Sequence, residues 1–270
     1  MQLTSLAQIT ITSRHIFLAP HFDDAVFSCG GTLAVQVSNG LHPLVITVFG
    51  GIPPQGWETS PYAHQVQREM GVSVPDSGSF VTNRRKEDAA ALDYLQADYL
   101  WLDYFDAIYR GNPAYYTARN QLIGGEVHPG DTGIERQLAQ DLVSLHERLP
   151  DTVWYAPLAV GRHVDHQIVA SSADRLIQRG ANVKFYEDFP YVLQEGALEA
   201  RIKDLGGALE PAYVEMSEML PLRLEASDFC TSQIAVNFGD RARMHRAMEN
   251  YTHDIRPVQT VHLERYWTVR

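Results

Sequence analysis

A strand, a helix and a second strand are predicted close to the N-terminus, and this unit limits the possible folds more than any other feature. Residues 16–19 form a short apolar run that Pro20 ends, and residues 25–37 have a helical pattern that stops near Gly40. Residues 44–49 (LVITVF) are rich in β-branched residues and end at two glycines, as a buried parallel strand does. These segments together have the length of a βαβ unit. The chain is therefore expected to contain a parallel sheet.

The same alternation continues to about residue 186. Further strands are predicted at 99–102, 152–156 and 183–186, with helices beginning at 83 and spanning 134–149 and 164–178. Residues 51–79 are expected to be mostly loop around one short helix at 63–70, and 109–129 to form an irregular insertion that faces the substrate. We predict an α/β fold of three layers, Rossmann-like, in which helices cover both faces of a mostly parallel sheet.

Residues 1–270 are interpreted as one domain whose last third, from about residue 190 to 270, is less regular. Helices are predicted there at 220–234 and 241–251, with a closing strand at 258–262. This part of the chain suits either a subunit contact or a lid, and the sequence leaves a homo-oligomer open.

The composition excludes several classes of protein. Lys and Arg total 22 and Asp and Glu total 33, so the net charge of −11 argues against binding to nucleic acid or an anionic membrane. No apolar run approaches the roughly 20 residues of a membrane span. Two cysteines, Cys29 and Cys230, are too few for a disulfide framework or a thiolate metal site. We expect no leader peptide and a cytoplasmic location.

Two clusters of imidazole and carboxylate groups follow predicted strands. One comes directly after residues 16–19 and the other shortly after 152–156. Their members are His21, Asp23, Asp24, His163, Asp165 and His166. Loops at the carboxyl ends of parallel strands converge on one crevice, so both clusters are expected to share a site. Two histidines and one aspartate are a ligand set that suits a catalytic Zn²⁺, and Fe²⁺ also suits it.

Simpler interpretations compete with a metal site. Asp23 and Asp24 also suit a helix N-cap, and taken alone His163 and His166 are ordinary surface or core histidines. The joint placement of both clusters at strand ends favours chemistry over these interpretations. A nucleotide-dependent oxidoreductase is disfavoured, because the first turn carries two carboxylates and no Gly-x-Gly-x-x-Gly. A non-catalytic sugar-binding or metal-storing module remains an alternative.

The segments that contain the two clusters resemble motifs of a known protein family. The segment APHFDDAVFSCGGTLA (19–34) resembles the Ala-His-Pro-Asp-Asp…Gly-Gly-Thr-Leu signature of the LmbE-like, or PIG-L, de-N-acetylases, and GRHVDHQIV (161–169) resembles their His-x-Asp-His motif. Four further segments agree in the same order: 46–51, RRKEDAAAL (84–92), FYEDFPYV (185–192) and FCTSQ (229–233). The resemblance implies a zinc-dependent amide hydrolase that removes acetyl groups from N-acetylglucosamine-type sugars, on a Rossmann-like fold. The runner-up is the same mechanism on a different N-acyl substrate.

The resemblance also implies a role for each member of the clusters. His21, Asp24 and His166 would bind zinc. Asp23 would be the general base and would return its proton to the departing amine. His163 would polarise the amide carbonyl and stabilise the oxyanion, and Asp165 would orient a histidine.

Other positions are less clear from the sequence. Arg84 and Glu87 match a family pair that is either a structural ion pair or a substrate contact. Phe22 and Ala25 depart from the Pro and Glu common in the family, so the loop must be held by packing instead of a fixed φ. Aromatic residues expected to overhang the crevice, about half of them as packing only, are Trp57, Tyr62, Tyr104, Phe105, Tyr109, Tyr115 and Tyr116.

Overall fold

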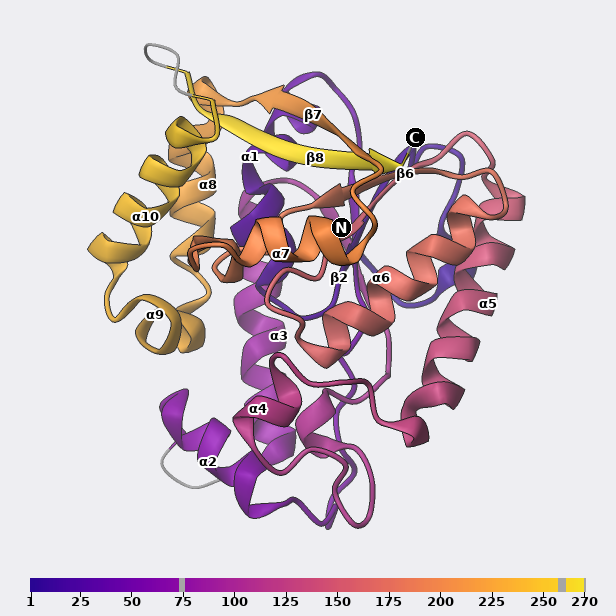
Figure 1. Cartoon of the computed structure of the whole chain (residues 1–270), viewed down its shortest axis with the longest axis vertical. Coiled ribbons are helices and arrows are strands. Elements are labelled where there is room, and N and C mark those ends of the chain that lie inside the picture. Colours follow the sequence, from indigo (N-terminus) through magenta and orange to yellow (C-terminus); the bar gives the residue numbers. More distant parts are fainter. Residues whose placement is uncertain (73–75, 257–260, 270) are drawn as a thin grey trace.

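A sheet of eight strands forms the central layer of the fold within the described residues (Figure 1). The computed structural model describes residues 1–72, 76–256 and 261–269. In spatial order the strands are β1 (Gln2–Leu3), β4 (Asp98–Trp101), β3 (Leu44–Thr47), β2 (His15–Ala19), β5 (Val153–Pro157), β6 (Asn182–Tyr186), β8 (Leu263–Val269) and β7 (Leu209–Glu215). The pairs from β1 to β6 are parallel, and β8 is antiparallel to both β6 and β7.

Helices cover both faces of this sheet, which confirms the predicted three-layer α/β fold. On one side α1 (Asp24–Ser38) and α3 (Ser77–Tyr94) pack with α8 (Leu220–Ser227), and on the other α5 (Thr132–Arg148) packs along α6 (Val164–Ile177) (Figure 1). The remaining helices are α2 (Pro61–Glu69), α4 (Arg119–Leu122), α7 (Ala197–Asp204), α9 (Thr231–Phe238) and α10 (Arg241–Asp254). None of the helices in the described ranges is both long and apolar enough to span a bilayer.

The order of the strands determines where the two predicted clusters lie. The chain leaves β2 toward β3 on one side, whereas β5 pairs with β2 on the other, so the order reverses between β2 and β5. The loops that follow these two strands open beside each other at their carboxyl ends, where open α/β sheets bind ligands. The two predicted clusters lie in these loops and in the first turns of α1 and α6, the helices that follow them.

The last third of the chain is more regular than expected. Besides the predicted helix at 241–251, now α10, it contains α7, β7 and β8. The prediction of a single helix at 220–234 was wrong. Helix α8 ends at Ser227, and a separate helix, α9, begins at Thr231. The closing strand expected at 258–262 falls largely on residues 257–260, outside the described residues, and β8 begins at Leu263.

This last third is attached to α1 by a buried carboxylate. Glu264 of β8 accepts hydrogen bonds from the backbone N–H groups of Gly31 and Thr32, both at 2.8 Å, and from the Thr32 hydroxyl at 2.6 Å. Arg223 of α8 pairs with the same carboxylate at 3.2 Å. Bonds to an ionised, buried carboxylate are strong, so β8 and α8 are fixed to the helix that carries Asp24.

Candidate active site

The predicted ligands meet at the carboxyl ends of β2 and β5. Oδ2 of Asp24 lies 3.3 Å from Nδ1 of His21 and 3.4 Å from Nε2 of His166. The ring of His163 is centred 4.9 Å from that of His21 and 5.2 Å from that of His166. All four residues are buried. His21, His163 and His166 each offer a nitrogen within 4.8 Å of the others, a spacing that a metal ion can bridge.

A buried carboxylate fixes the orientation of His21. Oδ2 of Asp165 lies 2.9 Å from Nε2 of His21, and this bond turns Nδ1 toward Asp24. Asp165 is itself held, since Arg110 donates to its Oδ1 at 2.6 Å and the backbone N–H of Ala107 donates to its Oδ2 at 3.1 Å. A carboxylate on the far nitrogen is the usual support of a metal-binding histidine.

His166 is oriented in the same way by a residue that the sequence analysis did not single out. Oδ1 of Asp188 lies 2.6 Å from Nδ1 of His166, and its Oδ2 accepts the backbone N–H of Val160 at 2.8 Å. The opposite nitrogen, Nε2 of His166, is buried and has no hydrogen-bond partner within the described residues. A buried polar atom without a partner is costly, and a metal ion shared with Asp24 and His21 would satisfy it.

The charges around these ligands favour a positive ion. Burial opposes ionisation of His21, but hydrogen bonds to Asp165 and Asp24 raise its pKa well above the usual value. Burial also opposes the charge of Asp24, yet His166 and His21 lower its pKa to about 2. The carboxylates therefore stabilise a cation at this place, as a proton or as a metal. The residues present fit a His₂Asp metal site.

Asp23 occupies the N-cap position of α1 without capping it. Its side chain accepts no hydrogen bond from the helix, so the interpretation of Asp23 as an ordinary cap was wrong. Instead Arg84 donates from Nη2 to its Oδ1 at 2.7 Å, and Oδ2 makes no hydrogen bond within the described chain. Burial raises the pKa of Asp23, and Arg84 opposes part of that rise. The free oxygen is available as a proton acceptor.

Phe22 supports this arrangement by packing, as expected for a loop without proline. It is buried, and the guanidinium carbon of Arg84 lies 5.3 Å from the centre of its ring. The ring of Trp101 is centred 6.2 Å from that of Phe22, in an edge-to-face arrangement. The aromatic ring thus places Arg84, which in turn holds Asp23.

His163 is held as a hydrogen-bond donor toward the site. It is the N-cap of α6, and its Nδ1 accepts the backbone N–H of Asp165 at 3.2 Å. Burial and the neighbouring His21 lower the pKa of His163 well below the usual value, so the ring is neutral. Since Nδ1 is an acceptor, the proton of the neutral ring is on Nε2.

Comparisons with known proteins place this chain in a family. The family model described as GlcNAc-PI de-N-acetylase, PIG-L, matches residues 16–177. The chain belongs to this family. Two curated relatives are 2'-N-acetylparomamine deacetylases, one from Niallia circulans (31% identical, 65% of this chain and 66% of the relative) and one from Streptomyces fradiae (31% identical, 76% and 67%). The chain thus spans about two thirds of the length of each.

A solved structure supports the fold of this PIG-L member over nearly its whole length. It is a triple mutant of a deacetylase involved in the teicoplanin biosynthetic pathway, and the match covers 95% of this chain and 98% of that one, with a TM-score of 0.75 and 26% identity. The family and both curated relatives are named for removing N-acetyl groups, which is hydrolysis of an amide. The His₂Asp cluster lies within the matched residues 16–177.

The cavity of this family member is small. It has a volume of about 100 Å³ and is lined by His21, Asp23, Asp24, Arg84 and His163, together with residues that the sequence analysis missed. Among these are Phe80, Asp106, Tyr191 and three residues of α9, namely Gln233, Val236 and Asn237. Of the seven aromatic residues expected at the mouth, only Tyr62 is among the lining residues. Tyr109 and Tyr116 instead pack in a buried cluster beneath the loops.

Arg84 and Glu87 do not pair with each other in the described chain, so the ion-pair interpretation is corrected. Arg84 binds Asp23, as above. Glu87 accepts hydrogen bonds from the backbone N–H of Ser232 at 2.9 Å and from the hydroxyls of Thr231 and Ser232. These are the first residues of α9, whose free N–H groups need an acceptor. Glu87 therefore positions the helix that forms one wall of the cavity.

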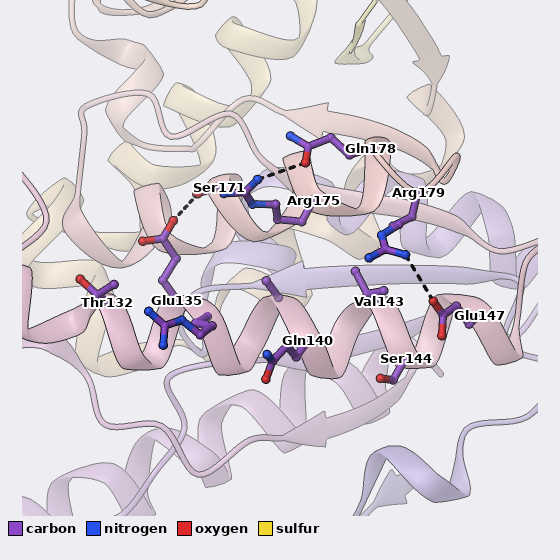
Figure 2. Close-up of a pocket in the computed structure, with 12 residues that line it drawn as sticks. Thr132, Glu135, Gln140, Val143, Ser144, Glu147, Ser171, Arg175, Gln178 and Arg179 are labelled. Atoms are coloured by element: carbon purple, nitrogen blue, oxygen red, sulfur yellow. Dashed lines mark hydrogen bonds and ion pairs between the residues drawn. The ribbon is translucent and has the colours of Figure 1, made fainter.

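A larger hollow of the surface lies elsewhere and lacks these features. It is a groove of about 620 Å³ between α5 and α6 (Figure 2). Its side chains already pair within the groove: Glu135 accepts from the Ser171 hydroxyl, Arg175 binds Gln178, and Arg179 lies 3.8 Å from Glu147 (Figure 2). No histidine or cysteine lines it. Four members of the two predicted clusters line the smaller cavity instead, namely His21, Asp23, Asp24 and His163.

Proposed function

We propose that this chain is a zinc-dependent hydrolase that removes the acetyl group from an N-acetylated amino sugar of the N-acetylglucosamine type, or from a conjugate of one. The main support for this proposal is Nε2 of His166. This nitrogen is buried beside Asp24 and has no hydrogen-bond partner within the described residues, and a metal ion would provide one. Membership of the PIG-L family and the two paromamine deacetylase relatives support the reaction and the class of substrate.

The metal would be held by His21, Asp24 and His166. A zinc ion lowers the pKa of water from about 16 to about 7 and polarises an acyl oxygen. Asp165 and Asp188 hold the two histidines so that one nitrogen of each faces Asp24. Fe²⁺ suits the same donors.

Asp23 serves as the base. Its Oδ2 takes a proton from the attacking water, whose oxygen forms a bond to the acyl carbon. The same carboxyl then gives the proton to the amine nitrogen as the C–N bond breaks, which releases acetate and a free amine. Arg84 keeps the other carboxylate oxygen fixed throughout.

His163 stabilises charge on the acyl oxygen. Its Nε2–H donates to that oxygen, which becomes more negative as the water attacks, and a neutral ring can do so without giving up its proton. The cavity of about 100 Å³ is smaller than the 300–1,000 Å³ typical of whole-ligand sites. It therefore suits the acetamido end of a substrate, with the rest of the conjugate at the mouth.

Metal content and amine release test this proposal together. We expect about one zinc per chain in the wild type, none in Asp24→Ala, and full metal in Asp23→Asn. Both variants should release less than about 1% of the wild-type amine from 2'-N-acetylparomamine or an N-acetylglucosamine conjugate. Asp103→Asn is the control, because its side chain is 92% exposed and lies outside the cavity.

Three results would overturn parts of the proposal. Absence of metal from the wild type, after zinc and iron are supplied, would refute the metal site. Full activity in Asp23→Asn would refute its role as base. Release of amine only from other N-acyl compounds would support the runner-up substrate class.

A further inference from the structure

The turn after β6 places a tyrosine hydroxyl in the cavity. Tyr191 lines the cavity with His21 and His163, and its ring centre lies 5.5 Å from that of His166, edge to face at 86°. Within the described residues its hydroxyl makes no hydrogen bond. By contrast Tyr116 donates to Asp131 and Tyr186 donates to the backbone carbonyl of Leu18. Tyr191 is half-buried, so its hydroxyl is accessible from the cavity.

Packing and the local backbone both fix the position of the Tyr191 ring. The ring lies against Gly161, where an added Cβ would be 2.8 Å from Cβ, Cγ and Cδ1 of Tyr191. The short turn that carries Tyr191 is closed by the backbone N–H of Val192, which donates to the carbonyl of Asp188, the residue that orients His166. The ring is therefore held in place by the same elements that hold His163 and His166.

The ring of Tyr191 lies among the groups of the site, with its centre 5.5 Å from that of His166 and 6.5 Å from that of His163. A tyrosine hydroxyl without an acceptor in the protein is an O–H donor to a ligand that enters the cavity. An acetamido group brings such an acceptor in its carbonyl oxygen.

We propose that Tyr191 is a further catalytic residue, which donates a hydrogen bond from its hydroxyl to the acyl oxygen beside the donor of His163. This assignment rests on the proposed function. The proton stays on Tyr191, so no additional transfer is needed. Two donors aimed at one developing oxyanion form an oxyanion hole, in which each is worth more in the transition state than in the ground state.

Tyr191→Phe removes the hydroxyl and keeps the ring that packs on Gly161 and His166. We expect kcat for the acetylated amino sugar to fall about 100-fold, the scale of losing one such donor, while KM, metal content and the melting temperature stay near wild type. Tyr191→Phe should also weaken binding of a tetrahedral methylphosphonamide analogue by a similar factor, but not binding of the free amine product. Tyr213→Phe, on the exposed side of β7, is the control and should match the wild type.

The outcomes separate the two proposals. Wild-type turnover in Tyr191→Phe would refute the role of the hydroxyl and leave the de-N-acetylase intact. A raised KM with unchanged kcat would also refute it, since the residue would then bind the sugar in both states. A wild-type protein that releases no amine and binds no metal would refute the proposed function, and the assignment of Tyr191 with it.

Discussion

Replacing Gly31 by alanine tests how the last third of the chain is attached to the site helix. Gly31 lies in α1, seven positions after Asp24, and its backbone N–H donates to Oε1 of Glu264 at 2.8 Å. An added Cβ would lie 2.6 Å from Sδ of Met216 and 2.7 Å from Oε1 of Glu264. Both neighbours are buried, so either can move only by displacing other packed atoms.

The expected cost follows from these contacts. Overpacking a buried site by one methyl costs about 1–3 kcal/mol. Displacing the Glu264 carboxylate from its donors adds about 1.5–3 kcal/mol, and alanine regains about 1 kcal/mol of helix propensity. The net loss is roughly 3 kcal/mol, which corresponds to a fall in melting temperature of about 6–12 °C for a chain of this size.

Urea and thermal unfolding of the purified variants measure this loss. Gly133→Ala is the matched control, because Gly133 lies in α5 and no heavy atom lies within 4 Å of the added Cβ. We expect that variant to be as stable as the wild type or slightly more stable. If Gly31→Ala unfolds at the same temperature as Gly133→Ala, the inference that Gly31 is required by the approach of β8 is wrong.

Three further predictions concern the groups around the site. Asp188→Asn should weaken zinc binding about 10- to 100-fold in a competitive chelator titration, because His166 loses its orienting carboxylate; unchanged affinity would contradict this. Arg110→Met should lower the free energy of unfolding by about 3–5 kcal/mol in urea, since Asp165 and Asp131 lose a buried counter-charge; a loss below 1 kcal/mol would contradict it. Dialysis against a chelator should abolish amine release, and added Zn²⁺ or Fe²⁺ should restore it; activity in metal-free protein would exclude a metal role.

The meeting of the two clusters was predictable because its information is local. His21 and Asp24 follow one strand, His166 follows another, and the parallel sheet brings the ends of these strands together. A regular alternation of strands and helices was enough to predict that meeting. The atoms that matter, Nδ1 of His21 and Nε2 of His166, were not predictable, because their choice depends on Asp165 and Asp188.

What the sequence did not reveal depends on contacts between distant segments. Asp188 stood in a recognised segment, FYEDFPYV, but its role needs β6 beside β5. Arg110 comes from the insertion at 109–129. Arg119, Leu122 and Ile123 of this insertion line the cavity, as expected, but Arg110 turns inward and binds Asp165. The break between α8 and α9 follows from Glu87, which is 144 residues away from Thr231 and accepts at the start of α9. The hydrophobic pattern of residues 220–234 contains no sign of that contact, so it could not predict the break.

The charges of the site explain why both histidines need carboxylate partners and a cation. The carboxylates around the cavity and beneath it are Asp23, Asp24, Asp106, Asp131, Asp165 and Asp188. Arg84 and Arg110 are the guanidinium groups that pair with them. The other two charged residues of the cavity lining, Glu69 and Arg119, cancel each other, so negative charge is in excess when the histidines are neutral. A buried excess of charge is costly unless an opposite charge compensates it. A divalent ion between His21, Asp24 and His166 would reduce the excess. A free ammonium group elsewhere on a sugar that carries several amino groups would reduce it further. The acidic groups therefore favour a substrate that is cationic away from its acetamido group.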